Sequence, residues 1–144
     1  MPEKETLKRA RKDKREGKAP STQAGEFVRE EIDHIREGKH GARSAKQAIA
    51  IGLSKARRAG VELPPPKNAS KETKEQAKRD LRKAKSGKKK STKRSRATLK
   101  ALKKEGRSAG SKTALSRQAH KAAGKRSAAS RSRSAKKAAK TRKK

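Results

Sequence analysis

The fold is decided between residues 20 and 60, PSTQAGEFVREEIDHIREGKHGARSAKQAIAIGLSKARRAG. Pro20 and Ser21 give a helix start signal, with Ser21 as a natural N-cap. The apolar residues that follow recur every three or four positions, which is the spacing of one helix face. This face consists of Ala24, Phe27, Val28, Ile32 and Ile35. The pattern predicts a helix over residues 21–38, ended by the glycines at 38 and 41.

A second helix is predicted over residues 44–59. Ser44 and Gln47 fit a capping box, in which Ser44 accepts from the Gln47 amide and Gln47 reaches back. The small residues Ala48 and Gly52 on its apolar face would permit a close approach to a neighbouring helix. The two helices form a hairpin of about 40 residues, near the lower limit for independent folding. We therefore expect a second copy of the chain or a bound ligand to complete the core, which leaves a homodimer open.

The composition favours a polyanionic partner. The 144 residues include 47 Lys and Arg against 14 Asp and Glu, a formal net charge of +33. Hydrophobic residues make up only 27%, Phe27 is the single aromatic and there is no cysteine. Nucleic acid is the usual partner for such a charge. A dense globule, a disulfide scaffold and a Cys-based zinc site are all disfavoured.

Charge and apolar residues are divided unequally along the chain. Residues 1–70 carry a net charge of +7 and residues 71–144 a net charge of +26. We therefore expect a mostly α protein in which a small hairpin is followed by marginal helices and a disordered basic C-terminal arm. The marginal helices are expected at 70–85, 95–105 and 111–123. The expected organisation is a charged N-terminal helix at 1–18, the hairpin at 19–63, a Pro-rich linker at 64–69 and a basic, partly helical to disordered arm at 70–144.

A short basic pattern recurs at residues 41–46, 106–112, 124–131 and 133–136. Each copy joins a Ser that can cap a helix to a neighbouring Arg or Lys, an arrangement that suits a phosphate oxygen. Chance repetition in a chain rich in Arg, Lys, Ser and Ala is the alternative for the three later copies. The first copy has better support because it lies between two predicted helices.

The best candidate site is therefore the loop at 38–44, where Lys39, His40 and Arg43 would surround a phosphate at the start of the second helix. An ordinary solvated loop is the competing interpretation. No set of base-reading side chains is apparent, so binding through phosphates is expected. The predicted nucleic-acid-binding residues are Lys39, His40, Arg43, Ser44, Lys46, Lys55, Arg57, Arg58, Lys88, Lys89, Lys90, Arg107, Lys112, Arg126, Arg131, Arg133, Lys136 and Lys137.

Other functional classes are disfavoured. The segment at 106–113 resembles a phosphate-binding P-loop, but Ser111 takes the place of the second glycine and no strand precedes it. His34 and His40 lack a third metal ligand in the sequence, so no metal and no cofactor are expected. No paired carboxylates lie in an apolar setting, so we expect no enzyme activity and no small-molecule substrate. The arm carries mostly Ala on its apolar faces, which argues against membrane binding.

The block GKHGARSAKQAIAIGLSKARRAG at residues 38–60 resembles an uncharacterised family, a domain of unknown function, of small Lys/Arg-rich bacterial proteins. This resemblance implies a bacterial source and a compact helical unit, but no activity. The tail at 128–144, whose last sixteen residues are ASRSRSAKKAAKTRKK, resembles the Ala/Lys-rich tails of bacterial histone-like and linker-histone-like proteins. That second resemblance implies non-specific DNA binding and compaction, although the tail lacks proline.

The leading hypothesis is a non-specific DNA backbone-binding protein of architectural, histone-like type, cytoplasmic and associated with the nucleoid. DNA is preferred over RNA as partner because stacking aromatics are lacking. The alternatives are an RNA-binding accessory protein and a protein-interaction hairpin with an electrostatic tail.

Overall fold

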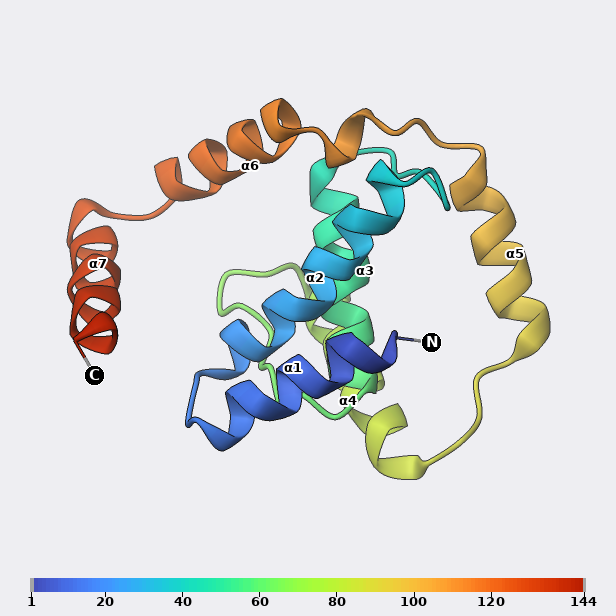
Figure 1. Cartoon of the computed structure of the whole chain (residues 1–144), viewed down its shortest axis with the longest axis horizontal. Coiled ribbons are helices and arrows are strands. Elements are labelled where there is room, and N and C mark those ends of the chain that lie inside the picture. The colour runs from blue at the N-terminus through green and yellow to red at the C-terminus, as the bar shows by residue number, and fades with distance from the viewer. Residues whose placement is uncertain (1, 144) are drawn as a thin grey trace.

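The computed structural model describes residues 2–143, and this part of the chain contains seven α-helices, one short 3₁₀ turn and no strand (Figure 1). The mostly α fold predicted from the sequence is confirmed. No helix in the described part is long and apolar enough to cross a membrane. The elements are α1 (Lys4–Arg15), α2 (Pro20–Arg36), α3 (Ala45–Arg58), α4 (Lys71–Ser86), α5 (Thr92–Lys103), η1 (Ser108–Gly110), α6 (Lys112–Gly124) and α7 (Ala128–Arg142).

Helices α2 and α3 form the predicted hairpin at the centre of the molecule, and their contact is the most extensive between any two helices described. Ser44 caps α3 by accepting from the Gln47 amide at 3.2 Å. Gln47 reaches back, but its side chain accepts from the amide of Arg43 rather than from that of Ser44, at 2.6 Å. Gly52 allows the close approach expected of it, since a Cβ there would lie 2.6 Å from the Val28 Cα.

The apolar face of the hairpin is covered from two sides by other parts of the chain. Helix α1 packs on α2, and α4 packs on α3. One buried cluster, which includes Phe27 and Val61, receives Ala10 of α1. A second cluster, which includes Ile32 and Ile35, receives Ala109 of η1. The chain therefore completes this core itself, and the physical reason for expecting a second copy or a ligand there is removed.

A buried carboxylate fixes α4 against α3. Asp80 is fully buried and accepts hydrogen bonds from Ser54 Oγ at 2.7 Å and from Arg58 Nε at 2.9 Å, both on α3. Gln76 of α4 donates a third bond to the same carboxylate at 3.1 Å. The folded unit thus supplies these partners of Asp80 itself. A buried charge needs such partners, because it is costly unless it is paired and hydrogen-bonded.

The helices expected at 70–85, 95–105 and 111–123 are present as α4, α5 and α6. The prediction of a disordered end to the arm is not supported, because residues 128–142 are helical as well. Ala, Lys and Arg have high intrinsic helix propensity, and a Ser caps each helix. Ser111 accepts from the Ala114 amide and Ser127 from the Ser130 amide, each at 3.1 Å. Low hydrophobicity limits packing rather than helix formation, so α5, α6 and α7 have no buried residue. Figure 1 shows α5 and α7 standing away from the central helices.

After α4, the chain returns to the hairpin just before α6. The amide of Gly41 donates to the carbonyl of Leu102 at 2.9 Å, and the amide of Ala42 donates to the carbonyl of Gly106 at 3.1 Å. Arg36 Nε donates to the carbonyl of Gly110 at 2.7 Å. These bonds place the start of α6 beside the start of α3.

Candidate nucleic-acid interface

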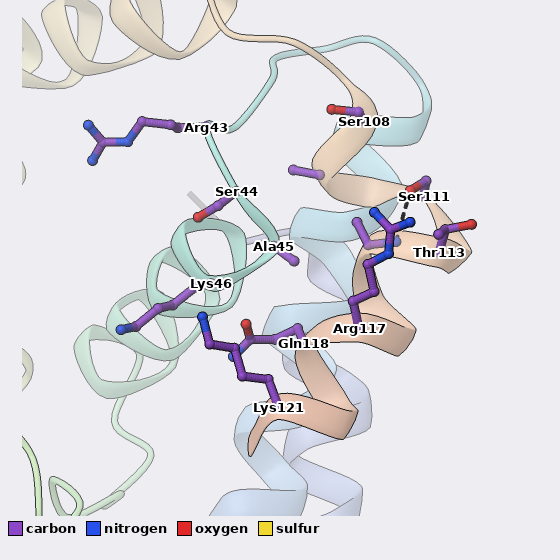
Figure 2. Close-up of a pocket in the computed structure, with 12 residues that line it drawn as sticks. Arg43, Ser44, Ala45, Lys46, Ser108, Ser111, Thr113, Arg117, Gln118 and Lys121 are labelled. Atoms are coloured by element: carbon purple, nitrogen blue, oxygen red, sulfur yellow. Dashed lines mark hydrogen bonds between the residues drawn. The ribbon is translucent and has the colours of Figure 1, made fainter. Parts of the chain in front are cut away.

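A groove of about 370 Å³ lies between the N-terminal ends of α3 and α6 (Figure 2). It brings together two copies of the repeated pattern, at 41–46 and 106–112, that are about 65 residues apart in the chain. Each copy supplies a Ser that caps its helix. The lining residues are Arg43, Ser44, Ala45, Lys46, Ser108, Ala109, Ser111, Thr113, Ala114, Arg117, Gln118 and Lys121.

The groove is electropositive. Four of its lining residues are Arg or Lys, and none is acidic. Both walls also end in a helix N-terminus, where backbone amides carry partial positive charge. A Ser cap satisfies one of the four unpaired amides of a first turn and leaves donors for an anion. In Figure 2, Gln118 and Lys121 of α6 point toward Lys46 of α3, whereas Arg43 extends away from α6. The arrangement can hold a phosphate group between two helix ends.

Two residues predicted at this site lie elsewhere. His40 is buried, with its Nε2 3.1 Å from the Glu31 carboxylate and its Nδ1 2.9 Å from the carbonyl of Gly41. Lys39 forms ion pairs with Glu37 at 3.1 Å and with Glu3 at 3.5 Å. Hydrogen bonding to Glu37 raises the pKa of Lys39. Neither residue lines the groove, so we leave both out of the proposed interface.

The basic residues at the end of α3 are bound inside the fold. Lys55 pairs with the buried Glu31, and Arg58 Nε lies 2.9 Å from the Asp80 carboxylate. Arg57 is buried and its Nε donates to the carbonyl of Leu63 at 2.9 Å, while desolvation lowers the pKa of its guanidinium. Lys55 thus joins α3 to α2, Arg58 joins α3 to α4, and Arg57 fixes the segment that follows α3.

The remaining predicted residues are on the arm, and all are exposed. Arg107 Nη2 donates to the carbonyl of Arg36 at 2.7 Å and so caps the C-terminus of α2. Arg126 donates to the hydroxyls of Ser130 and Ser134 within the last helix. Desolvation lowers the pKa of Lys90, and the nearby charges of Lys55 and Arg58 lower it further. The others are Lys88, Lys89, Lys112, Arg131, Arg133, Lys136 and Lys137.

The arm keeps its positive charge unpaired. Within residues 2–143, both members of every ion pair belong to the segment from Glu3 to Asp80. The chain after Asp80 holds one further acidic residue, Glu105. The carboxylates that form ion pairs all pair with cations of this same region. The N-terminal region thus has a modest positive charge that is partly paired, whereas α5, α6 and α7 present an uncompensated basic surface.

Sequence reasoning missed two features. Arg117 and Lys121 of α6 line the groove, but their meeting with α3 depends on the return of residues 105–110 to the loop at 41–42. The second feature is a buried cluster of Glu31, His34 and His40. The spacing of Glu31 and His34, three residues apart on one helix, was a visible signal, whereas the path of the loop that turns His40 inward was not.

Comparison with known proteins yields one match. Residues 11–67, which extend from within α1 to just beyond α3, match a family of unknown function (DUF6496). The expectation of an uncharacterised family is confirmed for this region, and it brings no activity with it. No curated protein and no solved structure matches the chain.

Proposed function

We propose that this protein binds the phosphate backbone of nucleic acid, with duplex DNA as the preferred partner, and does so without strong sequence preference. The observation that carries the proposal is the groove between α3 and α6, which is lined by two capped helix N-termini and four cations with no acidic residue. Helix N-termini and Arg or Lys side chains are the usual protein partners of phosphate oxygens.

The arm supports the same proposal through long-range attraction. Residues 71–144 have a net charge of +26, and α5, α6 and α7 bury none of their residues. Extended helices whose cations are not consumed by internal ion pairs can follow a charged backbone over several phosphates. The groove would then fix one phosphate, while the arm supplies most of the affinity.

The structure weakens the case for a hairpin that docks a protein partner. Ala24, Phe27 and Ile35 of α2 are buried by other parts of this chain. Leu99 of α5, at 42%, is the exposed large hydrophobic residue of the described chain. A docking helix presents several such residues in a row, so the charged surface is the better candidate for binding.

The experiment compares two double variants that remove the same charge from different places. Lys46→Gln with Lys121→Gln takes one cation from each wall of the groove, and Lys136→Gln with Lys137→Gln takes two from α7. We expect the groove variant to bind a 20-base-pair DNA duplex roughly 100-fold more weakly, since the two lost charge-assisted bonds to phosphate contribute about 1.5 kcal/mol each. The α7 variant should lose only a few-fold.

Fluorescence anisotropy at fixed salt measures both affinities, and circular dichroism checks that each variant keeps its helices. A matched RNA duplex in the same assay separates the DNA proposal from an RNA-binding role. If the two variants lose affinity equally, bulk charge alone drives binding and the groove is not a phosphate site. If the unmodified protein prefers the RNA duplex, the preference for DNA is wrong.

A further inference from the structure

We propose that Glu31, His34 and His40 form a binding site for a transition-metal ion such as Zn²⁺, separate from the nucleic-acid groove. Glu31 and His34 are one helical turn apart on α2, and His40 comes from the loop that leads to α3. One ligand atom from each of the three lies within 4.8 Å of those from the other two. Glu31 is the third ligand that the two histidines lack in the sequence.

The carboxylate of Glu31 has one oxygen to spare. Glu31 is fully buried, and its Oε1 is paired with Lys55. Its Oε2 is also buried but accepts no hydrogen bond. A buried carboxylate oxygen without a donor is costly, so a cation at this oxygen would remove the penalty.

The imidazole of His40 lies close to that oxygen. Its Nε2 lies 3.1 Å from Oε2, within ion-pair distance, yet the ring is not aligned to donate a hydrogen bond there. Two ligands of one metal ion both point at the ion, which lies between them, and not at each other. With Zn–N and Zn–O bonds of about 2.1 Å in a tetrahedral site, two ligand atoms are about 3.4 Å apart.

The other nitrogen of each histidine already has an acceptor. Nδ1 of His40 is 2.9 Å from the carbonyl of Gly41, and Nε2 of His34 is 3.0 Å from the Glu3 carboxylate, with Glu30 at 3.8 Å. The hydrogen bond from His34 lowers the pKa of the Glu3 carboxyl. A metal-bound imidazole usually donates its second N–H to a carboxylate or a carbonyl, which fixes the tautomer and the ring. Nε2 of His40 and Nδ1 of His34 are then the nitrogens left for the metal.

The surrounding charges permit a divalent ion. Lys55 remains paired with Oε1 of Glu31, so Oε2 is left for the metal. Lys39 faces Glu3, and Glu30 lies on the same side of His34. His34 is the most accessible of the three ligands, at 14% side-chain exposure, so an ion and a solvent ligand would enter from its side. Two imidazoles and one carboxylate with an open position suit Zn²⁺ and neighbouring first-row ions.

The test measures Zn²⁺ binding to the untagged full chain by isothermal titration calorimetry. We expect one Zn²⁺ per chain and an affinity at least about 100-fold weaker in both His34→Gln and His40→Gln, because even the loss of an outer-shell partner costs 10- to 100-fold. His120→Gln is the matched control, since His120 is exposed on α6 and is not part of the cluster of Glu31, His34 and His40. It should bind like the unmodified protein.

A second readout covers the case in which His40→Gln fails to fold. Saturating Zn²⁺ should raise the unfolding midpoint of the unmodified protein and of His120→Gln by roughly 5 °C, through binding to the folded state. The partly exposed His34→Gln should show no rise. If the unmodified protein binds no Zn²⁺, or if His34→Gln binds it equally well, the proposed site is wrong.

Discussion

Deletion of residues 126–144 is expected to weaken binding to duplex DNA by roughly 100- to 1000-fold at physiological salt while leaving the folded core intact. The deletion removes α7 and nine basic residues with no acidic one. If about four of these residues contact phosphates, the plot of log K against log salt becomes shallower by about 3.6. A loss of this size follows from counterion release alone.

The same deletion should not change stability, because α7 buries no residue and has no extensive contact with another described helix. The unfolding midpoint should stay within about 2 °C, as for surface changes that remove no packing. Fluorescence anisotropy over a series of salt concentrations gives the slope, and a thermal melt gives the midpoint. Unchanged DNA affinity after the deletion would show that the arm is not a binding element.

Substitution of Gly41 by Ala is expected to destabilise the protein by about 3 kcal/mol. A Cβ at this position would collide with the backbone carbonyls of Glu105 and Gly106, which cannot rotate away as a side chain would. The substitution therefore forces the two chain segments apart and weakens the bonds from Gly41 to Leu102 and from Ala42 to Gly106. Overpacking costs about 1–3 kcal/mol, and each lost hydrogen bond about 1 kcal/mol more.

Gly106→Ala is the matched control, because a Cβ there meets no atom within 4 Å and the backbone has no positive φ. Its unfolding free energy should stay within about 0.5 kcal/mol of that of the unmodified protein. Urea denaturation measures both variants. Since the displaced segment leads into α6, Gly41→Ala should also reduce DNA affinity by opening the groove. Equal stability of the two variants would mean that residues 102–106 do not pack on the loop at 41–42.

The hairpin could be predicted from the sequence because its signals are local. Periodic apolar residues, the Ser44 cap and the small Gly52 specify two helices and their close approach without reference to the rest of the chain. The helical structure at the end of the arm was harder to predict, because low hydrophobicity was taken to mean disorder. Ser111 and Ser127 cap helices whose Ala, Lys and Arg residues favour the helical backbone even where nothing packs against it.

The candidate site was only half predictable for a similar reason. Arg43, Ser44 and Lys46 could be placed at a helix start from their own sequence, and they line the groove. The second wall could not be predicted, because the contact of Gly41 with residues 102–106 joins segments about 60 residues apart. The inward turn of His40 likewise depends on the path of the loop between α2 and α3, which brings its Nε2 to 3.1 Å from the buried Glu31 carboxylate.

The central claim is that this protein binds nucleic acid through phosphates, and the salt dependence of DNA binding tests it most directly. The measurement is the affinity of the full chain for a duplex at several salt concentrations between about 0.05 and 0.3 M. Contact with about ten phosphates predicts that log K falls with log salt at a slope near −9, with little difference between duplexes of unrelated sequence. A slope near zero, or no measurable binding at the lowest salt, would contradict the account.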